Sequence, residues 1–205
     1  MTQNKLILFF TLLSILVSCK QNKETIQQMV DKGVDLVNAK KYNEAIAIYS
    51  KAIQRNPGIQ LTYYNRGIAF TELKDYSNAF TDFNKVIELQ TVDGYIVTYN
   101  SDFYPTEETK GQIPYNDALY QRAIVKFHMD SLNSAFLDFQ ILIDNNYEEK
   151  SNCLLWQATL LGKSGNPDKA CEYFVKAKEN AVTAAASQEA DEMIAKYCNR
   201  TESNP

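Results

Sequence analysis

A sequence period of about 34 residues in the first half of the chain constrains its fold more than any other feature. Gly67 lies one period after Gly33, and the residues that follow these two glycines recur at the same offsets. Small and aromatic side chains that return at a fixed spacing of this length indicate a stack of helix pairs rather than one closed domain. The matching pairs after the glycines are Tyr42 and Tyr76, Ala45 and Ala79, and Tyr49 and Phe83.

These residues resemble the tetratricopeptide repeat (TPR), a helix–turn–helix unit with the signature W-L-G-Y, A, F, A and P. By this resemblance repeats 1 and 2 occupy residues 26–91, and repeats 3 and 4 occupy residues 116–184. Residues 185–205 follow as a capping helix and tail, since a solenoid needs a cap over its last apolar surface. The resemblance implies an all-α fold: an α-solenoid of about four TPR helix–turn–helix repeats with an irregular insert and a C-terminal capping helix.

Local features predict how these helices pack and begin. Helix axes in contact lie about 8–10 Å apart, so the closest crossing accepts only a small side chain, which fits Gly33 and Gly67. Asp75 precedes the second helix of repeat 2 and is expected to cap its free N–H groups. Asn166 is expected to do the same in repeat 4, with Pro167 at the first helical position.

The insert, residues 92–115, breaks the period and is rich in aromatic residues. Alternation of side chains over Tyr95–Tyr99 permits a short strand or hairpin. Long loops of this kind are more often functional or mobile than neutral. Two interpretations stay open: a flap whose aromatic rings pack on the adjoining helices, or a partner-binding segment. The candidate binding residues in the insert are Tyr99, Phe103 and Tyr104.

The N-terminal residues predict an exported protein. Lys5 supplies a positive charge ahead of an apolar run over residues 6–17. A helix of this run is about 18 Å long, short of a hydrocarbon core of about 30 Å, so it is not a comfortable membrane span. Residues 1–18 are therefore expected to be a signal peptide.

The end of this segment, Leu16-Val17-Ser18-Cys19, resembles a bacterial lipobox. The resemblance implies lipidation at Cys19, followed by a polar tether over residues 19–25. Lys20 stands where lipoproteins of the inner membrane often carry Asp, so the outer membrane is favoured, with the protein facing the periplasm or the cell exterior. An ordinary signal peptide with an incidental cysteine is the alternative interpretation.

No residue pattern predicts catalysis, a metal site or a cofactor. His128 is the single histidine, and a solvated or groove-lining role is favoured over a catalytic one. Gly162-Lys163-Ser164 ends like a phosphate-binding loop, but the required first glycine is missing and a helix precedes it where a strand is needed. The net charge of −4 and the lack of a basic tract argue against nucleic acid as a partner. The sequence therefore predicts a protein that is not an enzyme.

The cysteines allow one further prediction. Cys171 lies near the start of the last repeat's second helix, and Cys198 ends the capping helix. If the chain turns near residue 184, the two cysteines lie almost equally far from the turn on antiparallel helices and face each other. We predict a disulfide between them, which an exported protein permits. Two buried free thiols are the alternative, and Cys153 is expected to stay unpaired.

The resemblance also implies that the first helices of the repeats line a concave groove that binds another protein or peptide. Aromatic anchors often dominate binding energy, although packing between repeats explains each of these residues equally well. Val30 and Val34 stand where some TPR proteins clamp the terminal carboxylate of a peptide, so that mode is disfavoured. The candidate groove residues are Tyr64, Asn65, Ile68, Tyr120, Ile124, Phe127 and Trp156.

The sequence thus predicts a membrane-anchored lipoprotein that serves as a scaffold and holds another protein, of unidentified kind, near the membrane. The groove, the insert or both would make the contact. The alternative is a cell-surface lipoprotein that binds glycans, with Trp156 or the insert tyrosines as stacking platforms.

Overall fold

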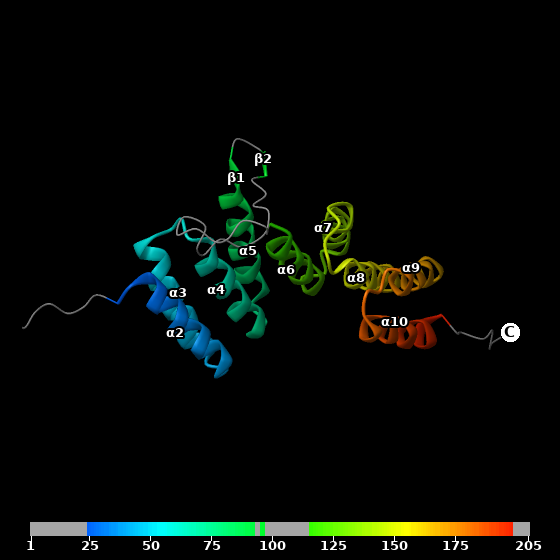
Figure 1. The fold of residues 1–205 in the computed structure, drawn as a ribbon, viewed down its shortest axis with the longest axis horizontal. Coiled ribbons are helices and arrows are strands. Elements are labelled where there is room, and N and C mark those ends of the chain that lie inside the picture. Colours follow the sequence, from blue (N-terminus) through cyan, green and yellow to red (C-terminus); the bar gives the residue numbers. More distant parts are fainter. Residues whose placement is uncertain (1–23, 93–94, 97–114, 199–205) are drawn as a thin grey trace, which may run out of the picture.

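The computed structural model describes residues 24–92, 95–96 and 115–198, and these ranges contain nine α-helices and two short strands (Figure 1). The all-α fold expected from the sequence is confirmed. The helices are α2 (Ile26–Asn38), α3 (Tyr42–Arg55), α4 (Gln60–Glu72), α5 (Tyr76–Gln90), α6 (Tyr115–His128), α7 (Leu132–Asp144), α8 (Lys150–Lys163), α9 (Pro167–Glu179) and α10 (Ala184–Tyr197).

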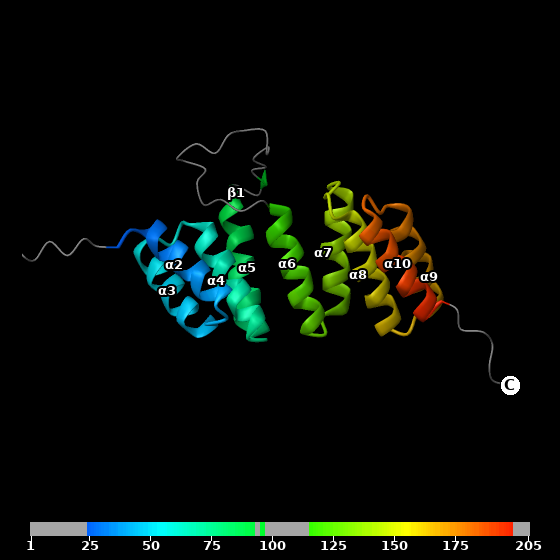
Figure 2. The ribbon, with the colours of Figure 1, turned by 60° about the horizontal axis from the view of Figure 1, so that its bottom comes forward.

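Successive helices pack as antiparallel pairs that stand side by side in chain order (Figure 2). The pairs are α2 with α3, α4 with α5, α6 with α7, and α8 with α9, and each second helix also packs against the first helix of the next pair. The extensive contacts therefore join consecutive helices, which is the arrangement of a solenoid. Helix α10 packs on α9 at the C-terminal end and covers part of its apolar surface.

The glycines expected at the closest helix crossings do lie there, and each faces an aromatic ring of the second helix. A Cβ atom on Gly67 would lie 2.9 Å from Cε1 of Phe83, and one on Gly33 only 2.4 Å from Cε1 of Tyr49. Both distances are shorter than van der Waals contact, so glycine permits the observed approach. The equivalent pairs in repeats 3 and 4 are Ala123 with Phe139 and Ala158 with Phe174, which share buried clusters.

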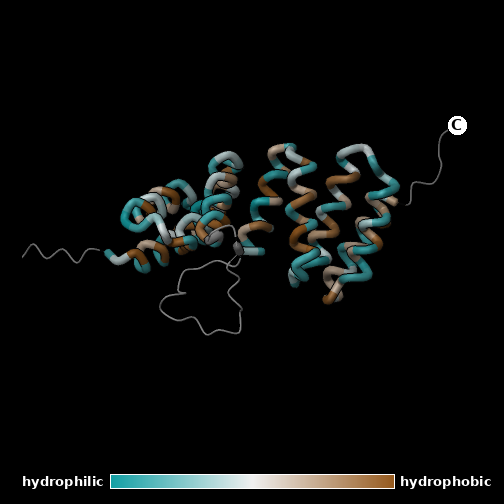
Figure 3. The backbone as a smooth tube through the Cα atoms, turned by 90° about the horizontal axis from the view of Figure 1, so that it is seen from above, coloured by the Kyte–Doolittle hydropathy of each residue, from teal (hydrophilic) through white to brown (hydrophobic). Residues whose placement is uncertain are grey.

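The core consists of clusters that lie between neighbouring helices. In Figure 3 hydrophobic stretches alternate with hydrophilic ones along the helices from α6 to α9, as expected of helices that bury one face. The largest cluster joins α6, α7 and α8. Its fully or almost fully buried members are Leu119, Ala123, Ala135, Phe139, Leu142, Cys153 and Leu160.

In each of repeats 2 and 3, a buried ion pair links the two helices of the repeat. In repeat 2 the guanidinium of Arg66 donates two hydrogen bonds to Asp82, at 2.8 and 2.7 Å, and a third to Ser50 on the preceding helix α3. In repeat 3 Arg122 binds Asp138 in the same bidentate way, with both distances 2.9 Å.

This second ion pair has two further partners. Arg122 reaches Asn84 on α5, which occupies the same repeat position as Ser50, so the same link between repeats recurs. Lys126, which replaces the aromatic residue of repeat 2, lies 2.7 Å from Asp138. Bidentate arginine–carboxylate contacts fix geometry as well as charge, so these pairs set how adjacent helices dock.

The two predicted helix caps differ in outcome. The Asp75 carboxylate accepts a hydrogen bond from the backbone N–H of Asn78 at 3.3 Å, as a capping residue does. Asn166 does occupy the N-cap position of α9 as predicted, but its side chain makes no capping hydrogen bond. Its amide instead lies 3.4 Å from the Ser164 hydroxyl, while Pro167 does occupy the first helical position.

A short hairpin begins the insert. Strands β1 (Thr91–Val92) and β2 (Tyr95–Ile96) pair antiparallel, with Thr91 opposite Ile96 and Val92 opposite Tyr95. The rest of the insert up to residue 114 lies outside the described residues, and so do the predicted signal peptide and most of the tether. Among the described helices, none is both long enough and apolar enough to cross a membrane.

Helix α10 is joined to α9 by a disulfide between Cys171 and Cys198, whose Cα atoms are 5.5 Å apart. The chain turns over residues 180–183, so Cys171 near the start of α9 lies opposite Cys198 at the end of α10. Among the described cysteines, Cys153 is free and buried, and burial raises its pKa to about 12. The thiol is therefore protonated and unreactive at neutral pH.

Candidate functional site

The described groove candidates all lie on the first helices of the repeats, and we call the face they share the first-helix surface. Each of these side chains is half-buried, so each packs on the protein with one part and meets solvent with another. The residues of the first-helix surface are Tyr64, Asn65 and Ile68 on α4, Tyr120, Ile124 and Phe127 on α6, and Trp156 on α8.

Trp156 is the centre of an aromatic cluster between α6, α7 and α8. Its ring lies parallel to that of Phe139, with centroids 6.0 Å apart, and meets Phe127 edge-on at 5.0 Å. The indole N–H donates a hydrogen bond to the Tyr120 hydroxyl, 3.3 Å away. Phe139 thus covers one face of the indole, and that face is not free to stack on a sugar.

Tyr64 and Tyr120 use their rings for packing, and both residues stay partly exposed. The Tyr64 ring meets Phe83 edge-on at 5.8 Å, and the Tyr120 ring meets Phe139 in the same way at 5.9 Å. Packing between repeats therefore accounts for the rings. The partly exposed remainder of these side chains is what this surface presents to a partner.

Acidic groups surround these hydroxyls. Burial raises the pKa of Tyr64, and the carboxylate of Asp117 raises it further, while a hydrogen bond to Gln121 opposes this. Burial is also the main cause that raises the pKa of Tyr120, where Glu149 and Glu189 add to it. Glu189 belongs to α10, so the capping helix contributes charge to the first-helix surface.

Tyr147 completes this end of the surface. Its hydroxyl donates a hydrogen bond to Oδ1 of Asp117 at 3.0 Å, and its ring lies 5.9 Å from that of Tyr120. Burial raises its pKa, with Asp117 as the next cause. We call Asp117, Tyr120, Tyr147, Glu149 and Glu189 the acidic end of the first-helix surface. Sequence reasoning missed four of these five, although Asp117 lies one turn before Tyr120 on the same helix face.

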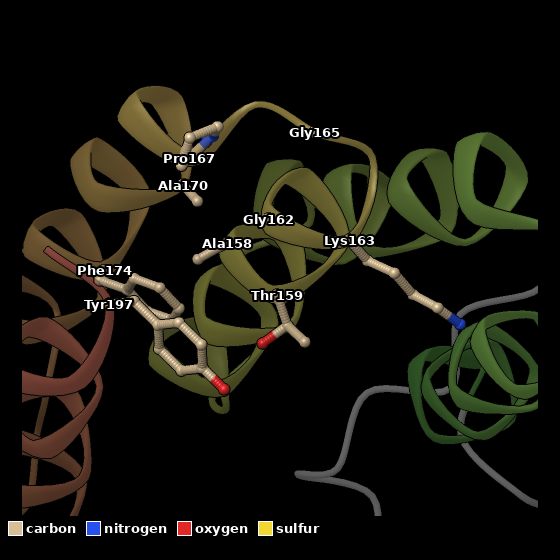
Figure 4. A pocket seen from close by; sticks show the side chains of 9 residues that line it. All are labelled: Ala158, Thr159, Gly162, Lys163, Gly165, Pro167, Ala170, Phe174 and Tyr197. Atoms are coloured by element: carbon tan, nitrogen blue, oxygen red, sulfur yellow. The ribbon is translucent and has the colours of Figure 1, made fainter. Parts of the chain in front are cut away.

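A cavity of about 580 Å³ is lined by residues of α8, α9 and α10, near the C-terminal end of α8 (Figure 4). Thr159 and Lys163 follow Trp156 by three and seven residues, so the three side chains share one face of the helix. Figure 4 shows Phe174 and Tyr197 forming one wall, with Lys163 directed away from it. The remaining lining residues are small or apolar: Ala158, Gly162, Gly165, Pro167 and Ala170.

His128 lies at the opposite end of α6 from Asp117. Its ring stacks on Tyr76, with centroids 4.7 Å apart and planes 4° from parallel. Partial burial lowers its pKa, and the nearby charges of Lys163 and Lys74 lower it further. This is a stacked surface histidine, as the sequence favoured, and its neighbours are cationic rather than the carboxylate that would orient a catalytic base.

In the described ranges, no three His, Cys, Asp or Glu side chains lie close enough together to hold a metal ion. The predicted site residues Cys19, Tyr99, Phe103 and Tyr104 lie outside the described residues, and their roles stay predictions.

The fold and this surface define a class of protein, the α-helical repeat scaffold. Comparison with known proteins is more specific, since residues 36–59 and 62–93 match the sequence model of the tetratricopeptide repeat. The two matched segments are tetratricopeptide repeats, and the described helices share the fold of TPR solenoids.

Individual proteins resemble parts of the chain. Stress-induced-phosphoprotein 1 of Caenorhabditis elegans is 30% identical over 100 residues, which are 48% of this chain and 31% of that protein. The chain spans about a third or less of the length of such curated relatives.

Two solved structures share the fold. MamA from Desulfovibrio magneticus RS-1 superposes with a TM-score of 0.62 at 16% identity, over 78% of each chain. The first TPR of Spaghetti (RPAP3), bound to the HSP90 peptide SRMEEVD, gives a TM-score of 0.51 at 21% identity, over 68% of this chain and 93% of that one.

Proposed function

We propose that this protein is a membrane-anchored scaffold that holds an extended segment of another protein on its first-helix surface. The observation that supports this most directly is the row of half-buried aromatic and aliphatic side chains that α4, α6 and α8 present on one face. Residues of this kind act as anchors because they bury large apolar areas and lose little conformational entropy. TPR scaffolds in general bind other proteins and are not enzymes.

The comparisons support a peptide as the bound element. One structural neighbour carries the peptide SRMEEVD, and that complex shows that a TPR fold of this kind can hold a short segment. This chain differs at the residues that would meet such an acidic peptide, since Val30 and Val34 supply no positive charge. The fold is shared, but the ligand of that neighbour does not transfer to this chain.

The anchor is the second part of the proposal. Lipidation at Cys19 rests on the lipobox-like residues before it and on an apolar run too short to span a membrane. Each buried methylene of an acyl chain contributes about 0.8 kcal/mol, so two or three chains hold a protein at a membrane almost permanently. The outer membrane is the proposed location.

A pull-down from the native host with the detergent-solubilised lipoprotein as bait tests the binding surface. We expect the double variant Tyr64→Ala with Tyr120→Ala to lose a partner that the unaltered protein captures. The matched control is Leu137→Ala with Ile141→Ala, because these two exposed apolar residues lie on α7, away from the first-helix surface. Thermal melting of each bait checks that it is folded.

Three outcomes would change the proposal. Capture by the Tyr64 and Tyr120 variant equal to that of the control would remove the first-helix surface as the binding site. Loss of the partner only when residues 95–113 are deleted would place the site on the insert. Binding to a panel of polysaccharides with no protein partner would support the glycan alternative, which no described contact favours.

A further inference from the structure

We propose that the first-helix surface selects peptides by a positive charge: a lysine or arginine side chain of the bound segment docks at the acidic end, between Tyr120, Tyr147 and the surrounding carboxylates. This inference rests on the proposed function and names the chemistry of the partner. It commits to an extended peptide segment with a basic side chain and an apolar side chain, in contrast to a segment with a terminal carboxylate.

Carboxylates of three separate elements act electrostatically on the tyrosines at this place, and Asp117 is in direct contact with one of them. Asp117 belongs to the first turn of α6, Glu149 directly precedes α8, and Glu189 lies on α10. Asp117 is held by the Tyr147 hydroxyl, and Glu149 accepts a hydrogen bond from the Asn152 amide. Both donors are neutral groups. These two contacts therefore do not cancel the negative charges of Asp117 and Glu149.

The aromatic rings at this end add to the attraction. Tyr120 and Tyr147 lie 5.9 Å apart with their planes tilted by 41°, so they form two sides of a corner rather than a stack. A cation that approaches aromatic faces is stabilised by the ring quadrupole, and carboxylates nearby strengthen this. The carboxylates do not converge closely enough for a metal ion within the described residues. A side chain that carries its charge on a long stem suits this spacing better.

The described positive charges on the same helices are mostly paired within the protein, in largely buried ion pairs for Arg66, Arg122 and Lys126 and in an exposed one for Lys163. Arg66 is paired with Asp82, Arg122 and Lys126 are paired with Asp138, and Lys163 is paired with Asp130. Lys150, the other lysine of α8, stands next to Glu149 in the chain. An acidic peptide would therefore meet uncompensated carboxylates where it needs free cations, while a basic peptide finds complementary charge.

The cavity on α8 supplies the second anchor. Two of its lining residues, Thr159 and Lys163, share a helix face with Trp156, and the rings of Phe174 and Tyr197 form a wall. Helix α8 rises about 1.5 Å per residue, so the cavity lies roughly 14–21 Å from Glu149 along the helix. An extended peptide covers this distance in roughly 4–6 residues. The bound segment should thus carry its basic and apolar residues at about this spacing.

Selection from a display library of random linear peptides, with the whole lipidated protein in detergent as target, tests the inference. We expect enriched peptides to share a lysine or arginine and an apolar residue at a fixed separation. For a synthetic consensus peptide, fluorescence anisotropy should show Kd at least about tenfold higher for the double variant Asp117→Asn with Glu149→Gln. Higher salt should weaken binding to the unaltered protein, because partly exposed charges are screened.

A matched control keeps the test specific. Glu172→Gln with Glu179→Gln removes the same two charges from exposed positions on α9 and should leave Kd unchanged. The Asp117→Asn side chain retains an oxygen that can accept the hydrogen bond of the Tyr147 hydroxyl, so we expect the variant to fold. Thermal melting checks that it does.

The outcomes separate this inference from the proposed function. Enriched peptides that are acidic, that depend on a free terminal carboxylate, or that bind the Asp117 and Glu149 variant as tightly as the unaltered protein would overturn the charge preference. If those peptides lose binding in the Tyr64→Ala, Tyr120→Ala variant, the first-helix surface still stands as the binding site. A selection that enriches no peptide would count against both.

Discussion

Single side chains decide how close the two helices of a repeat can come. The contact between a small residue on the first helix and an aromatic ring on the second recurs in all four repeats, but its chemistry differs. In repeat 1 the ring belongs to Tyr49, which is fully buried and whose hydroxyl has no hydrogen-bond partner among the described residues. In repeats 2, 3 and 4 it belongs to phenylalanine. Burial raises the pKa of Tyr49 to about 12, which agrees with a hydroxyl removed from water.

Tyr49→Phe is therefore expected to leave the protein as stable as before or more stable by about 1 kcal/mol, because removing a buried polar group without a partner relieves a cost. Such a group loses its hydration on folding and gains nothing in return. Urea unfolding followed by circular dichroism measures the change. The control is Tyr42→Phe, because the Tyr42 hydroxyl does have a partner, Glu72, at 3.0 Å. A clear loss of stability in Tyr49→Phe would show that its hydroxyl is satisfied in solution.

Gly67→Ala should destabilise the protein by about 1–3 kcal/mol, which is typical of an overpacked contact. The new Cβ atom would lie 2.9 Å from the Phe83 ring, and a ring that is fully buried has little room to shift. Thermal and urea unfolding measure the loss. Gly58→Ala is the matched control, since a Cβ atom there meets only the side-chain oxygen of Asn56, at 3.3 Å. Equal stability of the two variants would contradict the role assigned to Gly67.

At the scale of helices and strands, α10 closes the solenoid and also shapes the binding surface. It packs on α9 through Ala190, and its last residue, Tyr197, lines the cavity on α8. The disulfide between Cys171 and Cys198 holds this end of the helix in place. One covalent bond thus supports both the cap and a wall of the cavity.

Reduction of this disulfide should lower the stability of the protein by roughly 3–4 kcal/mol in the chain-entropy model, because closure of the loop restricts the unfolded chain. The bridge joins residues 27 positions apart. Thermal melting with and without reductant measures the effect. The variant Cys171→Ser with Cys198→Ser is the control and should melt at one temperature under both conditions. Identical melting of the unaltered protein in both conditions would show that the bridge does not form in solution.

The sequence predicts the helices well because their signals are local and periodic. The repeat spacing places Gly33 and Gly67 at the helix crossings where the structure has them. The interactions between helices were harder to anticipate. Arg66 and Asp82 lie on successive helices, and the recurrence of both residues at Arg122 and Asp138 is the one sequence signal that they form a pair. Glu189 acts on Tyr120 because α10 packs on α9 and touches α8, an arrangement that no spacing along the chain reveals.

The same limit explains the partial success at the candidate site. The positions of Tyr120 and Trp156 within their repeats were enough to predict that both lie on the first-helix surface. The structure brings the two side chains within hydrogen-bonding distance. Register could not find Tyr147, because it lies in the turn after α7 rather than on a first helix. Predicted residues in the insert and at the lipobox lie outside the described residues and stay predictions.

At the scale of the whole molecule, the proposed anchor and the binding surface are separate parts. Residues 19–25 can span at most about 25 Å, so an anchor at Cys19 would keep the first repeat close to the membrane. The acidic end and the cavity belong to repeats 3 and 4 and to α10, further along the solenoid. A partner bound there would be presented at a distance from the lipid.

Cys19→Ser should therefore separate location from binding. We expect the variant to lose incorporation of labelled palmitate, and with it the acyl chains that would hold the protein at the membrane, because serine lacks the thiol that carries the lipid. Its melting temperature and its Kd for a selected peptide should equal those of the lipidated protein, since the described fold begins only after Cys19, at residue 24. Lys20→Gln is the matched control and should keep the label. Palmitate incorporation in Cys19→Ser would place the anchor elsewhere, and weaker peptide binding would show that the tether takes part in the site.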